Sequence, residues 1–244
     1  YASWNWKANG SGSANTDGSI NSTVSANTTS GFSIVSWTGS GANATIGHGL
    51  SSAPEFITIK NRNDASSWLT YLTTIGAGNF LRLNEANASA SGSTPFNNTA
   101  STSSVFSVGA NNDTNGSSDS MIAYCFSSVK GFSKIGSYTG NGNSDGTFVY
   151  TGFKPAFLMV KSSSSAGDSW FMFDDKRTTS NVMGSYIRAE SGNAEGSDTA
   201  LDFISTGFKL RSTSGAFNDQ TTFVYMAFAS APLVGTNNVP CTAR

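Results

Sequence analysis

Charged side chains are scarce in this chain. Only 12% of its 244 residues are Asp, Glu, Lys or Arg, and the formal net charge is −1. A surface that binds nucleic acid or an anionic membrane needs clustered Lys and Arg, so the composition predicts neither partner. The polar surface must instead consist mainly of Ser, Thr, Asn and Gly.

Cysteine, histidine and long apolar runs are also in short supply. The two cysteines, Cys125 in an apolar segment and Cys241 near the end, do not indicate a disulfide scaffold. The single histidine, His48, lies in Gly-His-Gly without the Gly-x-Ser-x-Gly turn of a serine hydrolase, which favours a strand-end role over catalysis. No apolar run approaches the length of about 20 residues that a membrane-spanning helix needs, so no membrane insertion is expected.

Aromatic residues, by contrast, are abundant at 12% of the chain, with 17 Phe. They recur in short segments that are rich in Phe, Tyr, Ile and Val and bounded by Gly, Asn and Ser, a pattern typical of β-strands. No window shows a 3.6-residue apolar period with helix caps. The sequence therefore predicts an all-β protein, with strands at residues 56–59, 80–83, 105–108, 121–126, 148–150, 156–160, 170–173, 185–188, 201–204, 208–210 and 222–228.

The landmarks in the first half of the chain recur about 100 residues later. Gly-Phe-Ser at residues 31–33 returns at 131–133, and Trp-Thr-Gly-Ser-Gly at 37–41 matches Tyr-Thr-Gly-Asn-Gly at 138–142. Further matches pair residues 54–60 with 155–161, 67–68 with 169–170, Arg82 with Arg188, 105–106 with 207–208, and 122–126 with 224–228. Turn glycines and apolar strand residues dominate the shared positions, so the repeat preserves a shape and no catalytic set.

These matches predict two tandem β-sandwich domains of the jelly-roll type, related by internal duplication. We expect the repeats at residues 31–130 and 131–232, followed by a C-terminal tail at 233–244. Residues 1–30 are expected to hold a strand and a linker that end a preceding domain, with Tyr1 not the natural start. Whether the repeats exchange strands stays open.

Aromatic residues at matching places in the two repeats are the candidate glycan contacts. Trp68 matches Trp170, and Trp37 matches Tyr138. An aromatic ring can stack on the apolar face of a pyranose while Asn, Asp and Ser bind its hydroxyls. The alternative, that these residues pack in a sandwich core, is the favoured interpretation.

Asn141, Asn143 and Asp145 alternate before a glycine, as at the start of an EF-hand loop. Gly152 stands where the bidentate Glu of such a loop is required, so a hairpin turn is favoured over a weak calcium site. Glycan hydrolysis would need two suitably spaced carboxylates, but the densest charge cluster, at residues 174–177, resembles a solvated loop with ion pairs. We therefore assign no catalytic, cofactor-binding or metal-binding residues.

Several segments together resemble one known family. They are Tyr-Ala-Ser-Trp-Asn-Trp-Lys-Ala at residues 1–8, Gly-Phe-Ser-Ile-Val at 31–35, Gly-His-Gly-Leu at 47–50, Ile-Ala-Tyr-Cys-Phe at 122–126, Tyr-Thr-Gly-Asn-Gly at 138–142, Thr-Gly-Phe-Lys-Pro-Ala-Phe at 151–157 and Tyr-Met-Ala-Phe-Ala at 225–229. This combination resembles an uncharacterised domain that recurs in structural proteins of marine bacteriophages. The resemblance covers nearly the whole chain and carries over no catalytic residues.

The resemblance implies a virion protein, typically the C-terminal module of a tail fibre, spike or other appendage. We expect a non-enzymatic module on the particle surface that contacts other virion proteins and attaches to a host glycan or outer-membrane receptor. Such appendages are usually symmetric oligomers, and a trimer is the first expectation. No cofactor is implied. Two alternatives stay open: a purely structural head decoration, collar or fibre-shaft piece, and a polysaccharide depolymerase.

Overall fold

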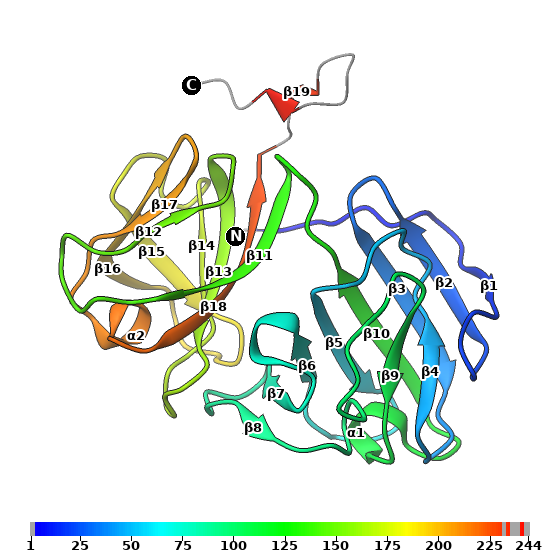
Figure 1. Cartoon of the computed structure of the whole chain (residues 1–244). Coiled ribbons are helices and arrows are strands. Elements are labelled where there is room, and N and C mark those ends of the chain that lie inside the picture. The colour runs from blue at the N-terminus through cyan, green and yellow to red at the C-terminus, as the bar shows by residue number, and fades with distance from the viewer. Residues whose placement is uncertain (1–2, 231–232, 235–239, 242–244) are drawn as a thin grey trace. The chain divides into compact units, whose positions relative to one another are not determined.

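The computed structural model describes residues 3–230 and the short strands at 233–234 and 240–241 (Figure 1). In this part of the chain β-strands dominate, and the helices are single turns: a 3-10 turn at Thr73–Ile75, α1 (Asn112–Asn115) and α2 (Gly215–Asn218). Every sheet is built by antiparallel pairing of its named strands. The predicted all-β class is confirmed.

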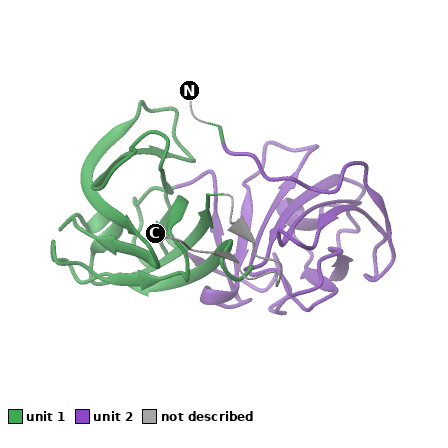
Figure 2. Ribbon diagram, turned by 90° about the horizontal axis from the view of Figure 1, so that it is seen from above, with its two compact units in different colours: residues 1–3, 86–88, 129–244 green, residues 4–85, 89–128 purple. Residues whose placement is uncertain are grey.

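The chain divides into two compact units (Figure 2). We call residues 4–85 with 89–128 the first lobe, and residues 129–230 with 86–88 the second lobe. The change from one unit to the other at residues 128 and 129 lies beside the boundary expected from the repeat. Most of the expected C-terminal tail falls outside the described residues, apart from the backbone of β19 (Leu233–Val234) and β20 (Pro240–Cys241).

The first lobe is built on an eight-stranded sheet in the order β1-β2-β3-β10-β5-β6-β7-β8, with a separate two-stranded sheet, β4-β9. Side chains from both sheets share one core, in which Val35, Ile57 and Met121 of the large sheet meet Ile46 and Phe106 of the pair. The strands are β1 (Ser13–Asn15), β2 (Ser22–Asn27), β3 (Phe32–Thr38), β4 (Ala44–Gly47), β5 (Phe56–Asn61), β6 (Leu69–Leu72), β7 (Asn79–Arg82), β8 (Ala90–Ser91), β9 (Val105–Val108) and β10 (Ser120–Phe126).

The second lobe has one eight-stranded sheet, in the order β11-β18-β13-β14-β15-β16-β17-β12. Its two outer strands are consecutive in the chain, and where they join, Thr147 Oγ1 donates to Thr139 O at 2.8 Å. The strands are β11 (Ser133–Thr139), β12 (Phe148–Tyr150), β13 (Pro155–Ser162), β14 (Phe171–Asp174), β15 (Met183–Arg188), β16 (Gly196–Ile204), β17 (Gly207–Leu210) and β18 (Thr222–Ala229).

The sheet of the second lobe thus nearly closes into a barrel, which differs from the expected pair of stacked sheets. The cause lies in β16, a nine-residue strand that pairs with β15 on one side and β17 on the other. It therefore continues the hydrogen-bonded ladder into β12. In the first lobe the strand at the same place in the order, β8, has only two residues, and the sheet stops there.

Six strands have the same spatial order in both lobes: β3-β10-β5-β6-β7-β8 and β11-β18-β13-β14-β15-β16. The register agrees as well, because Leu69 faces Arg82 in the first lobe and Phe171 faces Arg188 in the second. Each guanidinium carbon lies 5.1 Å from the centre of the aromatic ring two residues earlier in its strand. The two arginines paired by sequence thus have matching surroundings.

The structure corrects the expectation for residues 1–30. Instead of a linker, β1 and β2 extend the first lobe's sheet beyond β3. Val24 and Ala26 face the core at strand spacing, a weak apolar signal within a Ser- and Asn-rich stretch. The strand expected at residues 1–6 is absent where it is described, at residues 3–6, and the Trp6 ring instead packs edge-on against Phe126, with centroids 5.8 Å apart.

Candidate functional site

A buried asparagine holds the glycine loop that follows β3 in the first lobe. Asn115, the last residue of α1, accepts at Oδ1 from the backbone N–H of Ser40 (3.1 Å) and from Trp37 Nε1 (3.2 Å). Its Nδ2 donates to Ala42 O at 2.7 Å. The amide is fully used inside the protein, so its role is to fix the loop.

Asn218, the last residue of α2, does the same for the loop that follows β11 in the second lobe. Its Oδ1 accepts from the backbone N–H of Asn141 at 3.1 Å. Its Nδ2 donates to Asn143 O at 2.8 Å and to Ser212 O at 2.7 Å. Both asparagines are completely buried. Sequence reasoning missed them, because each one acts on a loop more than 70 residues away along the chain.

Three of the four candidate glycan contacts are buried, and two of them, Trp37 and Tyr138, lie in the cores of the two lobes. Trp37 is 6% exposed, Tyr138 7% and Trp170 1%. Tyr138 stacks on Phe223 with centroids 5.1 Å apart and donates from its hydroxyl to Phe217 O at 2.7 Å. Trp37 and Tyr138 thus have the core role that was the favoured interpretation, and Trp170 is buried without being part of either core cluster.

Trp68 is the one candidate glycan contact that keeps a partly exposed ring. It stacks on Tyr124, with ring centroids 6.3 Å apart and an interplanar angle of 17°. Tyr124 alternates along β10 with the core residues Ala123 and Cys125, so it lies on the opposite face of the sheet. One face of the Trp68 ring is therefore occupied within the first lobe.

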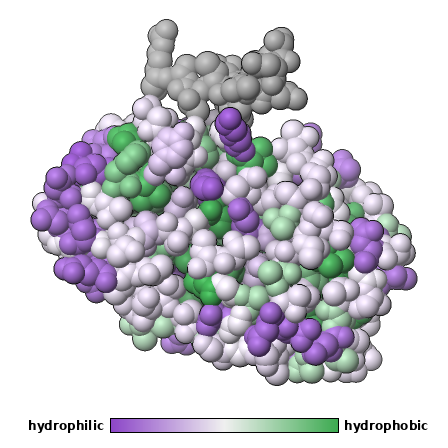
Figure 3. Space-filling view, viewed as in Figure 1, coloured by the Kyte–Doolittle hydropathy of each residue, from purple (hydrophilic) through white to green (hydrophobic). Residues whose placement is uncertain are grey.

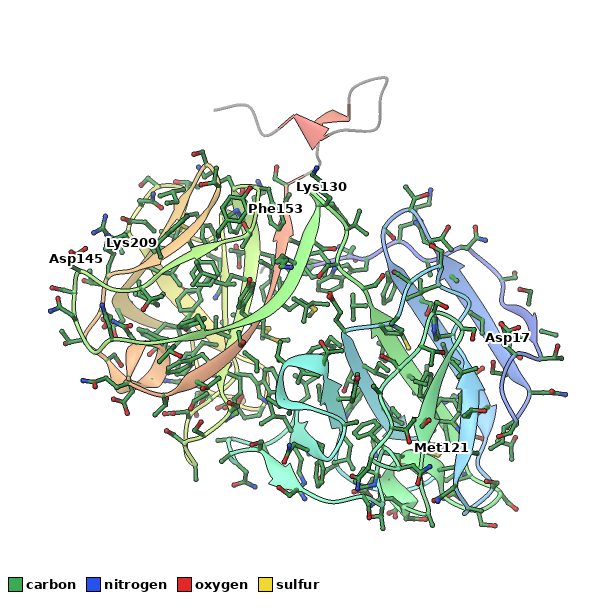
Figure 4. The ribbon with its side chains drawn as sticks, in the orientation of Figure 1. Asp17, Met121, Lys130, Asp145, Phe153 and Lys209 are labelled. Atoms are coloured by element: carbon green, nitrogen blue, oxygen red, sulfur yellow. The ribbon has the colours of Figure 1, made fainter. Side chains whose placement is uncertain are left out.

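The candidate calcium residues form a chain of turns. Asn141 Oδ1 accepts from the backbone N–H of Asn143 at 3.0 Å, and Asn143 Oδ1 accepts from that of Asp145 at 2.9 Å. The Asp145 carboxylate pairs with Lys209 Nζ at 2.8 Å, and the two labelled side chains lie together at the edge of the second lobe (Figure 4). These oxygens serve the loop itself, as Asx turns do.

His48 is buried at the end of β4, where it links the backbone of two segments. Its Nδ1 accepts from the Leu50 N–H at 3.1 Å, which leaves the proton on Nε2, 3.1 Å from Thr102 O. Burial lowers the pKa of His48, although the hydrogen bond to Thr102 and the charge of Asp17 oppose this shift. The ring is neutral and has both nitrogens occupied, in agreement with a structural role.

The most buried carboxylates of the second lobe are held by arginines. Asp174 Oδ2 lies 2.6 Å from Arg177 Nε, and Asp202 Oδ2 lies 2.6 Å from Arg211 Nε. Although burial opposes it, the hydrogen bonds and charge of Arg177 lower the pKa of Asp174. Among the described residues there is no group of three or more His, Cys, Asp or Glu side chains that could hold a metal ion.

Two aromatic rings that the sequence did not single out are exposed on β12. Phe148 is 46% exposed and Tyr150 66%, whereas Val149 between them is buried in the core. The strand had been predicted, and its two-residue period already implies that these rings share the outer face when Val149 points inward. That signal was available in the sequence. In the view of Figure 3 most of the surface has the pale colour of intermediate hydropathy.

The fold and this surface describe an all-β protein with a low density of charge. No helix among the described residues is long and apolar enough to cross a membrane. A family model for a domain of unknown function (DUF7483) matches residues 1–232, so the chain belongs to this family. No curated protein and no solved structure matches the chain.

Proposed function

We propose that this chain is a non-enzymatic module of a bacteriophage particle, at the C-terminal end of a tail fibre, spike or other appendage, that attaches to a glycan or outer-membrane receptor on the host. The motifs that resemble structural proteins of marine phages motivate this proposal. The observation that carries it is the use of the shared residues. Asn115 and Asn218, like the core aromatics Trp37 and Tyr138, serve packing and loop geometry.

We also propose that both lobes arose by duplication of one domain. It is supported by the common order of six strands, by the matching registers at Arg82 and Arg188, and by the two asparagine anchors. If the residues shared by the two copies maintain the fold, the receptor would be bound by exposed residues that differ between the copies. Rigid scaffolds with variable loops are a common basis for binding proteins.

The ion pairs of Asp174 and Asp202 make the alternative function, a polysaccharide depolymerase, less suitable. A glycosidase needs one carboxyl group that is protonated as an acid and a second that acts as base or nucleophile. Arg177 instead favours the ionised form of Asp174, because an adjacent positive charge stabilises a carboxylate. Asp174 is therefore better suited to holding a loop than to proton transfer, and the Asp202 carboxylate is held in an ion pair with Arg211.

A binding assay on whole cells tests the attachment function. The full chain, labelled with a fluorophore, is incubated with a panel of marine bacterial isolates and counted by flow cytometry. We expect saturable labelling of a subset of strains, competed by unlabelled protein and reduced when surface glycans are oxidised with periodate or surface proteins are digested. A protein that labels no strain would overturn the proposal. Release of reducing sugar from host polysaccharide would favour the depolymerase instead.

A further inference from the structure

We propose that Phe148 and Tyr150 form an aromatic platform on β12 that binds a neutral saccharide. This inference rests on the proposed attachment function and assigns its contact site. The two residues are two positions apart on one strand, so their rings project from the same face about 6.6 Å apart along the strand. They are the exposed large aromatic side chains of the described residues, at 46% and 66%.

Each ring has a glycine beside it. A methyl group built on Gly207 would lie 3.1 Å from the Phe148 ring, and one built on Gly152 would lie 3.6 Å from the Tyr150 hydroxyl. Each ring therefore packs beside a residue without a side chain, while a large part of it stays exposed. A flat apolar surface with a polar hydroxyl beside it suits the apolar face and the hydroxyls of a pyranose.

The platform is absent from the corresponding strand of the first lobe. Ile46 on β4 pairs with Phe106, as Val149 on β12 pairs with Phe208, so Thr45 and Gly47 take the places of the two exposed aromatics. Because the first lobe folds around the same pairing without these rings, the architecture does not require them. Exposed aromatics that the fold does not need indicate contact with a partner.

The charges beside the platform favour a neutral ligand. Lys209, which faces Phe148 across the strand pair, is bound to Asp145 at 2.8 Å and to Gly146 O at 2.8 Å. Opposite charges in this pair cancel, so Lys209 does not offer an unpaired positive charge to a ligand on the platform. An acidic glycan would find no unpaired cation in this pair.

The alternative occupant is a strand of another protein chain, because β17 is the only described strand that pairs with β12, which leaves β12 at the edge of the sheet. However, β12 has just three residues and is followed within two residues by Gly152 in the left-handed region, with φ of 86°. Short edge strands that end in a turn are poor templates for strand addition. The exposed ring faces are therefore the more suitable contact.

An array of neutral and acidic oligosaccharides, probed with the full chain, tests this site. Isothermal titration with the strongest neutral oligosaccharide then compares Tyr150→Ser, Phe148→Ser and Tyr150→Phe with the wild type. We expect binding to neutral sugars, a loss of about tenfold in affinity for each Ser variant, and a change of no more than about twofold for Tyr150→Phe, which keeps the ring. Val182→Ser removes an exposed apolar side chain elsewhere in the second lobe and is expected to change nothing.

The proposed saccharide site is wrong if the protein binds no neutral sugar or binds acidic sugars alone. It is also wrong if wild type and Tyr150→Ser have equal affinity. A change of oligomeric state in Tyr150→Ser, measured by sedimentation velocity, would assign the surface to a protein contact and reject the saccharide.

Cell labelling separates this inference from the attachment function. If wild type and Tyr150→Ser label cells equally, the platform fails while attachment stands. If the array shows tyrosine-dependent sugar binding but no strain is labelled, the platform stands and attachment fails.

Discussion

Asn115 and Asn218 make the same backbone contact in their respective lobes. Asn115 O accepts from the N–H of Gly41 at 2.8 Å, and Asn218 O accepts from the N–H of Gly142 at 2.6 Å. In both cases the glycine is the second of a Gly-x-Gly loop and has a positive φ, 69° and 65°. The side-chain amide of each asparagine binds the same loop, so one residue holds the turn through both its backbone carbonyl and its side chain.

Replacement of Asn218 by Ala is expected to destabilise the second lobe by about 3 kcal/mol, because several buried loop groups lose their hydrogen bonds. Urea unfolding followed by circular dichroism measures the change. Asn193→Ala, at an exposed position, is the matched control and is expected to lie within about 0.5 kcal/mol of the wild type. If both variants unfold at the same urea concentration, the anchor role of Asn218 is wrong.

Gly140→Ala is expected to be destabilising by about 2–3 kcal/mol, since overpacking forces the backbone to move. A Cβ atom at this position would lie 2.1 Å from Asp219 O, and the corresponding Cβ at Gly39 would lie 2.0 Å from Gly116 O. At Gly192, where no atom lies within 4 Å, alanine is expected to have little effect. Thermal melts of the two variants provide the comparison, and equal melting temperatures would contradict it.

The sequence was sufficient to predict the all-β class, many of the strands and the correspondence of Arg82 with Arg188. These features depend on local patterns: the two-residue period, the glycine turns and the order of landmarks. The core positions of Trp37 and Tyr138, which match between the two halves, also agree with the favoured interpretation.

Other features depended on contacts that leave no local pattern. The anchor role of Asn218 arises from loops that come together only in the folded chain. The near closure of the second lobe follows from the length of β16, of which only residues 201–204 were expected as a strand, because its first half is polar. The exposed faces of Phe148 and Tyr150 could have been inferred from the period of β12, had the inward direction of Val149 been fixed first.

The buried side chain of Lys161 is expected to make the protein more stable as the pH rises into the alkaline range. It is fully buried, and its Nζ donates to Ser162 O at 2.9 Å and to Ala86 O at 3.4 Å. Burial lowers the pKa of Lys161 from 10.5 to about 8, although the charges of Asp168 and Glu190 oppose this shift. Between these two pH values the unfolded chain binds more protons than the folded chain, so the free energy of unfolding increases with pH, by up to about 3 kcal/mol.

Urea titrations at pH 7.5, 8.5 and 9.5 measure this slope for the wild type and for Lys161→Met. The variant has an unbranched side chain of similar length but no titrating group, so we expect it to lose this part of the pH dependence. An identical slope in both proteins would show that Lys161 is not the group responsible. Lys176→Met, which changes an exposed lysine, controls for the loss of one charge.

Titration of His48 is expected to lower the free energy of unfolding at acidic pH. Because burial lowers its pKa below 6.5, the unfolded chain takes up a proton at a higher pH than the folded chain does. The stabilising contribution of neutral His48 is therefore complete above pH 6.5 and is lost as the pH falls below that value. Protonation of Nδ1 would also place a second hydrogen against the Leu50 N–H, which now donates to that atom.

Replacement of His48 by Asn keeps an acceptor for this N–H and removes the titration. The difference in free energy of unfolding between wild type and His48→Asn, measured from pH 7.5 to pH 5, is expected to shift against the wild type as the pH falls. Carboxylates that titrate in the same range are common to both proteins and cancel in this difference. A difference that stays constant across the range would mean that the ring does not have the lowered pKa that its burial implies.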